Sequence, residues 1–259
     1  MLTLEQIKSY YSGRALLFPE NILVEYLQYE LLDSIYKQKK SASLSFIGGT
    51  AIRIVHGSGR FSEDLDFDNF GLTFDEFEGL FKEVVRDMEL KGFFVEFRFV
   101  EKGAYHCYIK FPHILHKEKL TRDSGKKILV RIDTVNKKGN HKINKFTLNK
   151  FDIYRKILVN SPDIILAQKM ITILNRKREK GRDFYDVSYL FGKTQPDYKY
   201  IENYLQTDRK TFIQDLLKRC KEMDYSFLAK DVEPFLIDPS QSERVLDFYD
   251  FIKTKAKEV

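Results

Sequence analysis

Two short segments in the first quarter of the chain constrain its fold more than any other feature. Residues 46–51 (FIGGTA) end an apolar stretch with two glycines and a threonine. Residues 60–67 (RFSEDLDF) place two carboxylates two positions apart among apolar neighbours. On a strand, alternate side chains share a face, so Asp64 and Asp66 are predicted to point the same way while Leu65 faces the core.

This pattern predicts a site for a metal ion and a phosphate. Asp64 and Asp66 carry like charges that repel unless a cation lies between them, and Mg²⁺ is usually held by one or two carboxylates plus substrate phosphates. Gly48 and Gly49 allow a phosphate to approach the backbone at the start of the next helix, where Thr50 follows. An ordinary strand-to-helix turn with Thr50 as N-cap is compatible with this reading. The combination is typical of phosphoryl or nucleotidyl transfer.

The same residues carry a resemblance to a known family. Gly48 to Thr50, followed by a Ser-x-Asp-x-Asp pattern that begins at Ser62, looks like the first motif of polymerase-β-type nucleotidyltransferases. Within that superfamily the segments resemble the AbiEii/AbiGii toxin family. A later stretch, residues 165–169 (ILAQK) and 182–190 (RDFYDVSYL), strengthens the match, with Phe184 where leucine is usual.

The resemblance implies a fold, an activity and partners. It implies a nucleotidyltransferase that uses a nucleoside triphosphate, releases pyrophosphate and works as the toxin of a type IV toxin–antitoxin or abortive-infection system. Related toxins add nucleotides to the acceptor end of tRNA, so an RNA acceptor and a cognate antitoxin are the expected partners. Lys169 is expected to contact the triphosphate, Asp183 to belong to the active site, and Asp186 to bind nucleotide.

A third carboxylate stands at a position where this superfamily often carries one. Asp133 lies in a run rich in β-branched residues, 128–135, and shares a strand face with Arg131. Aspartate is disfavoured in strands, so its presence needs a reason. It could complete a two-Mg²⁺ site with Asp64 and Asp66, accept the proton of an attacking hydroxyl, or simply pair with Arg131.

The other site residues also have structural readings. Lys169 could extend its ammonium group from an apolar helix to water, and Asp183 and Asp186 could cap a helix or form salt bridges after the basic run 176–180. Arg53 and Arg60 could neutralise a triphosphate, with Ser62 beside them, or form surface salt bridges. The five histidines show no metal-binding spacing and are predicted to be structural or exposed.

The composition and charge of the chain exclude several classes of protein. The net charge of +6 favours a polyanionic partner such as RNA. Two isolated cysteines exclude a disulfide framework and a zinc site. The N-terminal segment lacks the basic and apolar regions of a signal peptide, and no apolar run approaches the ~20 residues that span a bilayer. A cytoplasmic protein without membrane contact is therefore expected.

Hydrophobic periodicity predicts an α/β class, and the resemblance implies a polymerase-β-like fold. A nucleotidyltransferase lobe, residues 1–150, is expected to hold a small mixed sheet flanked by helices, and residues 151–259 an all-helical lobe. Strands are expected at 44–47, 64–67, 93–100, 105–111, 128–135 and 157–159, and a polar, basic loop at 113–127. Helices are expected at about 19–36, 50–56, 74–91, 163–180, 182–191, 198–206, 209–222, 226–236 and 241–256.

Two other functions fit the same chemistry. The acceptor could be a small molecule such as an aminoglycoside, or a protein hydroxyl. Alternatively, the chain could be a regulatory module that binds a nucleotide without turnover. Salt-sensitive binding of tRNA would distinguish an RNA acceptor from a small one, because phosphate contacts release counterions.

Overall fold

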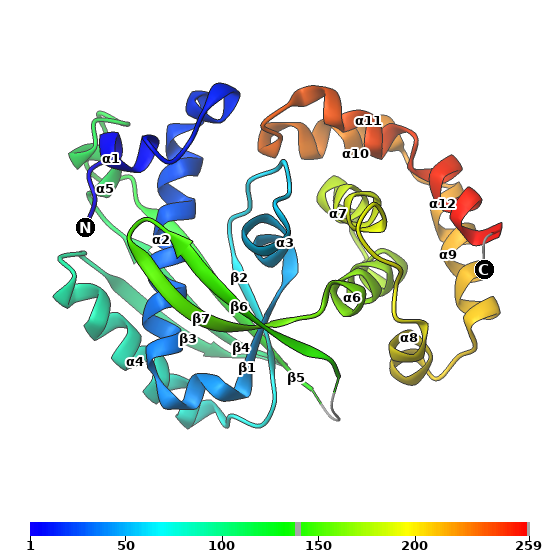
Figure 1. Cartoon of the computed structure of the whole chain (residues 1–259), viewed down its shortest axis with the longest axis horizontal. Coiled ribbons are helices and arrows are strands. Elements are labelled where there is room, and N and C mark those ends of the chain that lie inside the picture. Colours follow the sequence, from blue (N-terminus) through cyan, green and yellow to red (C-terminus); the bar gives the residue numbers. More distant parts are fainter. Residues whose placement is uncertain (138–140, 258–259) are drawn as a thin grey trace. The chain divides into compact units, whose positions relative to one another are not determined.

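The computed structural model of the chain describes residues 1–137 and 141–257 (Figure 1). Residues 1–51 and 61–159 form one compact unit, called here the α/β unit. Residues 52–60 and the chain from Asn160 onward form a second, called the helical unit. The division predicted at residue 150 stays a prediction.

The α/β unit is built on a seven-stranded sheet in the order β3-β4-β5-β2-β1-β7-β6. Strand β1 is antiparallel to β2 and parallel to β7, and β2 is parallel to β5, so the predicted mixed sheet is confirmed. The strands are β1 Leu44–Ile47, β2 Leu65–Asn69, β3 Glu96–Glu101, β4 Tyr105–Phe111, β5 Ile128–Asn136, β6 Ile143–Lys150 and β7 Ile153–Asn160.

The sequence does not predict strand β6 or the first half of strand β7. The two strands form a hairpin (green in Figure 1) whose two turn residues, Phe151 and Asp152, have φ of 59° and 61°. Asn-Gly is the usual signal for such a turn, and here it is absent. Phe151 is buried, and its ring lies 5.0 Å from that of Tyr10 and 5.1 Å from that of Tyr29. Packing of this ring, rather than local turn chemistry, accounts for the hairpin.

The helices of the α/β unit follow their local signals more closely. Thr73 and Glu76 form the predicted capping box at the start of α4. Pro19 occupies the first turn of α2, as its fixed φ favours. The segment 113–127, expected to be all loop, contains one short helix, α5. The helices are α1 Leu4–Lys8, α2 Pro19–Lys37, α4 Phe74–Leu90 and α5 Ile114–Lys117, while α3 Gly48–His56 begins in the α/β unit and belongs to the helical unit from residue 52 onward.

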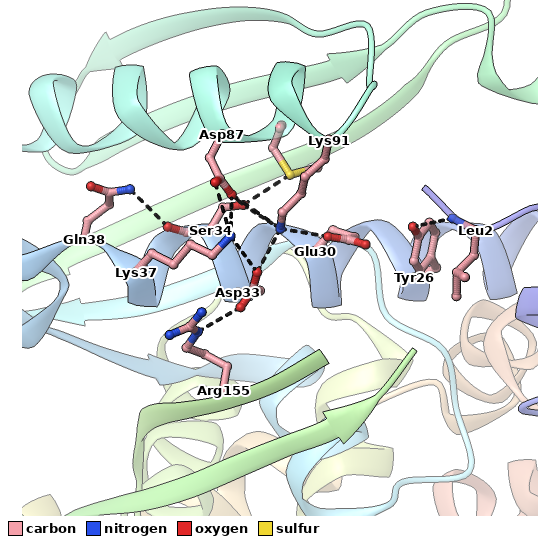
Figure 2. Close-up of polar contacts among 11 residues, drawn as sticks. Leu2, Tyr26, Glu30, Asp33, Ser34, Lys37, Gln38, Asp87, Lys91 and Arg155 are labelled. Carbon is pink, nitrogen blue, oxygen red and sulfur yellow. Dashed lines mark hydrogen bonds and ion pairs between the residues drawn. The ribbon is translucent and has the colours of Figure 1, made fainter. Parts of the chain in front are cut away.

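A polar network joins α2 to the end of α4 and to β7 (Figure 2). The Asp33 carboxylate lies 2.8 Å from Lys91 Nζ and 2.8 Å from Arg155 Nε. Lys91 Nζ is also 2.8 Å from Glu30 Oε2. Burial raises the pKa of Asp33, but its bonds to Lys91 and Arg155 outweigh that effect and lower the pKa to about 2. The network therefore stabilises the charged form of Asp33.

Asp33→Asn is expected to lower the free energy of unfolding at pH 7 by about 3 kcal/mol, because Lys91 and Arg155 lose their shared carboxylate. A depressed pKa contributes stability above the unfolded value and loses it as the pH falls through the folded value. The difference between wild type and variant should thus shrink by about 2 kcal/mol between pH 5 and pH 2 in urea titrations. Glu83→Gln, at an exposed carboxylate on α4, is the control. A difference independent of pH would contradict the assignment.

The helical unit keeps most of the predicted helices, with three changes. The helix expected at 163–180 ends at Asn175, and the helix expected at 226–236 ends at Val232, shortly before Pro234. The helix expected at 241–256 divides into two at Asp247. Ser161 stands at the predicted N-cap position, but its hydroxyl makes no capping bond. The helices are α6 Pro162–Asn175, α7 Gly181–Phe191, α8 Tyr198–Leu205, α9 Arg209–Lys221, α10 Tyr225–Val232, α11 Glu243–Leu246 and α12 Phe248–Lys257.

The helical unit has its own aromatic core. The Phe184 ring packs edge-on against Phe248 at 4.9 Å and against Tyr225 at 5.9 Å, measured between ring centroids. These contacts account for the aromatic side chain at position 184. Within the described ranges, 1–137 and 141–257, no helix combines the length and apolarity needed to cross a membrane.

Candidate active site

Three carboxylates gather on one face of the sheet in the α/β unit. Asp66 on β2 pairs directly with Asp133 on the parallel strand β5. Directly paired residues of neighbouring strands point to the same face, and Asp64 lies two positions before Asp66 and so on that side too. Asp64, Asp66 and Asp133 are called here the carboxylate cluster. The structure thus brings together the three predicted metal ligands.

Two basic side chains contact this cluster. Arg131 places Nη2 3.0 Å from Asp64 Oδ2 and Nε 2.8 Å from Asp133 Oδ2. His106, directly opposite Asp133 on β4, places Nδ1 2.7 Å from Asp133 Oδ1. The predicted pairing of Arg131 with Asp133 is present, whereas His106, expected to be structural or exposed, lies at the site. Only the β4–β5 register reveals the position of His106.

The negative charge of Asp64 is poorly compensated by the groups around it. Burial raises the pKa of Asp64, Arg131 opposes this, and the charges of Asp133 and Glu63 add to the rise. The net effect is a pKa above the ordinary value, so Arg131 does not offset the cost of the charged form. A carboxylate in this state gains from a further cation.

Gly48 is required by the position of Asp66. Strand β1 ends at Ile47, which pairs with Asp66, and helix α3 begins at the next residue. Gly48 has φ of +77°, and a Cβ atom placed on it would lie 2.1 Å from Asp66 Oδ2. The Asp66 carboxylate therefore lies against the first turn of α3, which includes Gly49. The first N–H groups of a helix lack intrahelical partners and favour anions.

Thr50 and Ser62 hold the two segments in place. Thr50 is fully buried inside α3, and its hydroxyl donates to the backbone carbonyl of Asp64. Because α3 begins at Gly48, Thr50 is not the N-cap, and that reading is wrong. The carbonyl of Ser62 accepts a hydrogen bond of 2.8 Å from Gln28 Nε2. Direct contact of either residue with a nucleotide stays a prediction.

Gly48→Ala is expected to abolish nucleotide transfer and to lower the free energy of unfolding by about 2 to 4 kcal/mol. The added Cβ would strike the Asp66 carboxylate, and the left-handed backbone would be strained. Gly79→Ala is the matched control, because a Cβ there meets nothing within 4 Å on α4. Activity assays and thermal unfolding of both variants test this, and a fully active Gly48→Ala protein would contradict the close contact.

The donor set fits Mg²⁺ held by two carboxylates. Among residues 1–137 and 141–257, no three His, Cys, Asp or Glu side chains are arranged to hold a metal ion. Mg²⁺ does not need three, since it usually keeps waters and substrate phosphates as ligands. Asp64 and Asp66 offer hard oxygen donors on one face, and a bound cation would offset the burial that raises the pKa of Asp64. Asp133 as a third ligand stays a prediction.

Most of the remaining predicted residues meet in a buried ion-pair network of the helical unit; they are Arg60, Lys169, Asp183 and Asp186. Arg60 clamps Asp186 with Nε 2.7 Å from Oδ1 and Nη2 2.6 Å from Oδ2. The exposed fractions of these two side chains are 2% and 0%. Lys169 Nζ lies 3.0 Å from Asp183 Oδ1 and 2.9 Å from Asp186 Oδ2. Arg176 Nε closes the network 3.2 Å from Asp183 Oδ2.

Mutual attraction keeps this network charged despite its burial. Burial raises the pKa of Asp186, but Arg60 and Lys169 outweigh it and the net pKa is lowered. Burial lowers the pKa of Lys169, but Asp186 and Asp183 outweigh it and the net pKa is raised. The pKa of Arg60 is likewise raised by Asp186 against the effect of burial. All three groups are therefore ionised at neutral pH.

The salt bridges of Asp183 and Asp186 that the sequence offered as an alternative are confirmed, whereas two other structural alternatives are wrong. Arg60 forms a buried pair rather than a surface salt bridge, and the Lys169 ammonium group is held by carboxylates. Arg53 donates from Nη1 to the carbonyl of Ser58 at 2.6 Å. Nucleotide contacts by Arg53, Arg60, Lys169 and Asp186, and a catalytic role for Asp183, stay predictions.

Comparison with known proteins identifies the family. The family model described as the nucleotidyl transferase AbiEii toxin of type IV toxin–antitoxin systems matches residues 30–253. The chain belongs to the AbiEii family. The motifs that carried the resemblance lie between residues 46 and 190, so the match shows that most of the C-terminal helices also belong to the AbiEii pattern.

Solved structures confirm the fold of this AbiEii chain. JHP933 from Helicobacter pylori is 15% identical with a TM-score of 0.54, over 92% of this chain and 94% of that one. A structure described as a nucleotidyltransferase candidate from H. pylori is 15% identical with a TM-score of 0.57, over 92% and 97%. At this identity the likeness concerns the fold alone. No curated protein matches the chain.

Proposed function

We propose that this AbiEii protein is a Mg²⁺-dependent nucleotidyltransferase that moves a nucleotide from a nucleoside triphosphate to an RNA acceptor, tRNA, in the cytoplasm. A cognate antitoxin would restrain it. The observation that carries the proposal is the carboxylate cluster beside the glycine start of α3. Asp66 touches the position where a Gly48 Cβ would stand, so the acidic pair and the anion-favouring helix start are adjacent.

The chemistry follows from this adjacency. A hydroxyl oxygen of the acceptor bonds to the α-phosphorus of the triphosphate as the bond to the pyrophosphate leaving group breaks. Asp64 and Asp66 would hold Mg²⁺, which supplies positive charge for the attacking and leaving oxygens when bound. The N–H groups at Gly48 to Thr50 orient the phosphates, and Asp133 either completes the metal site or accepts the hydroxyl proton.

The resemblance assigns Lys169 to the triphosphate and Asp183 to the active site, and we retain both roles as proposals. A lysine suits phosphate binding as a point charge. Its two carboxylate partners, at 3.0 and 2.9 Å, fix its position within the helical unit. The net charge of +6 supports a polyanionic acceptor.

Transfer of label from each α-³²P nucleoside triphosphate tests the proposal and its alternatives together. The protein is incubated with Mg²⁺ and, separately, with total RNA, an aminoglycoside or a protein extract. We expect label in RNA only. Label in the aminoglycoside or in protein would move the assignment to a different acceptor. Label in none, together with nucleotide binding, would indicate a regulatory module without turnover.

Expression of the protein without an antitoxin is expected to stop bacterial growth by halting translation. One turnover disables one acceptor molecule, so modest amounts of enzyme can exhaust a pool that every cell needs. The Asp66→Asn variant should be harmless at equal expression. Normal growth with abundant, folded wild-type protein would contradict the toxin assignment, as would equal toxicity of both proteins.

A further inference from the structure

The basic segment 113–127 of the α/β unit lies outside the site described above, and the structure gives it a defined shape. Helix α5 is anchored by Ile114 and Leu115, which are both buried. The chain then turns back, and Leu120 N donates to the Leu115 carbonyl at 2.8 Å. Lys119 adopts a left-handed φ of 58°, uncommon for a residue with a side chain. The turn is therefore fixed by packing and backbone bonds.

This turn surrounds an open cavity of about 800 Å³, called here the basic cavity. Its lining contains four basic side chains and no acidic one. None of its Lys or Arg side chains forms an ion pair with any residue of the described ranges. The lining residues are His116, Lys117, Lys119, Leu120, Thr121 and Arg122.

Lysines just outside the basic cavity do have ion-pair partners. Lys126 Nζ lies 2.7 Å from Glu20, and Lys127 Nζ lies 2.7 Å from Glu96, so the next two lysines are paired. Glu118, the acidic residue within the turn, accepts the Leu4 N–H at 2.9 Å and does not line the cavity. Lys117, Lys119 and Arg122 thus carry positive charges that no ion pair within the described ranges neutralises, and these charges attract an anionic partner.

We propose that the basic cavity binds the phosphate backbone of the RNA acceptor, an inference that rests on the proposed function. Lysine ammonium groups and an arginine fork are the usual partners of nucleic-acid phosphates. The cavity is too large and too open for one small anion and suits successive phosphates of a strand. Among the described residues that line the cavity, Leu120 alone is apolar, so this lining lacks the aromatic centre typical of a protein–protein interface.

A pair of charge-matched variants tests this assignment. Lys117→Gln, Lys119→Gln and Arg122→Gln together remove three positive charges from the cavity. Lys210→Gln, Lys218→Gln and Lys221→Gln remove three from exposed positions on α9. Both sets are combined with Asp66→Asn, and tRNA binding is measured by fluorescence anisotropy at several salt concentrations. Thermal unfolding checks that both proteins are folded.

The cavity variant is expected to bind tRNA at least about tenfold more weakly at 0.1 M salt, and to reduce the slope of log K against log salt by about 2 to 3. The control set should change affinity less than about twofold. With an active Asp66, the cavity variant should raise KM for tRNA but leave kcat and KM for the triphosphate unchanged.

Three results would overturn the assignment. They are an unchanged tRNA affinity, an equal loss in both variants, which would reflect bulk charge alone, and a selective loss of poly-glutamate binding, which would assign the cavity to an acidic protein. Failure of the proposed function is distinguishable, because then wild type itself transfers no label to RNA. Wild-type transfer with an unaffected cavity variant would remove only the cavity assignment.

Discussion

Replacing Asp66 by asparagine is expected to lower the rate of nucleotide transfer about a thousandfold or more. The amide keeps the size of the side chain but loses its charge, so Asp64 cannot hold Mg²⁺ with a charged partner. The amide has the same size as the carboxylate that lies against Gly48, so the substitution should preserve the fold. Single-turnover transfer at saturating triphosphate measures the loss directly.

A second measurement tests Mg²⁺ binding independently of the rate of nucleotide transfer. Mg²⁺ should raise the melting temperature of wild type, because a ligand that binds only the folded state stabilises it. It should not raise that of Asp66→Asn. Glu63→Gln removes one carboxylate charge from an exposed neighbouring position and should keep both transfer and the Mg²⁺ effect. Near-normal turnover in Asp66→Asn would contradict the assignment of the metal ligands.

Replacing Arg60 by methionine is expected to lower the free energy of unfolding of the helical unit by about 3 to 5 kcal/mol. Among the residues that the structure describes, the substitution leaves Asp186, whose side chain has no exposed surface, with Lys169 as its one charged partner. Urea unfolding followed by circular dichroism measures the change. Arg178→Met, at an exposed arginine outside the network, is the control and should stay within about 0.5 kcal/mol.

The double variant Arg60→Met with Asp186→Asn distinguishes a coupled pair from general disruption. Removing both charges should cost less than the sum of the single losses, because no carboxylate is left buried without its arginine. Additive losses would show that Arg60 acts through packing alone. A loss for Arg60→Met no larger than that of Arg178→Met would contradict a stabilising role for the pair.

The pH dependence of this network has two opposite limits. Asp186 has a lowered pKa, so its contribution exists above the unfolded value of 3.8 and is lost as the pH falls through the folded value. Lys169 has a raised pKa, so its contribution exists below 10.5 and is lost as the pH rises through the folded value. The network is therefore at full strength across the neutral range.

Local signals explain which parts of the fold could be predicted. Strands β1 and β4 match their predicted bounds, and the Thr73 capping box forms, because apolar runs and caps act over a few residues. Strand β6 was missed because its lysines and asparagines do not alternate clearly and it lies at the edge of the sheet. The turn at Phe151 depends on tertiary packing that no local pattern records.

The candidate site, like the fold, can be predicted from the sequence only where local patterns determine it. Strand periodicity alone predicts that Asp64 and Asp66 share one face. The contact of His106 with Asp133 depends on the register between β4 and β5, which the sequence does not give. The Arg60–Asp186 pair joins residues 126 positions apart, so no local pattern in the sequence predicts that these two side chains meet.

The intact mass of purified tRNA, after incubation with the protein, Mg²⁺ and each nucleoside triphosphate in turn, tests the central claim most directly. The account predicts that at least one triphosphate increases the tRNA mass by one or more nucleoside monophosphates, with equal release of pyrophosphate. Asp66→Asn should produce no such increase. An unchanged tRNA mass with all four triphosphates and folded wild-type protein would contradict transfer to tRNA.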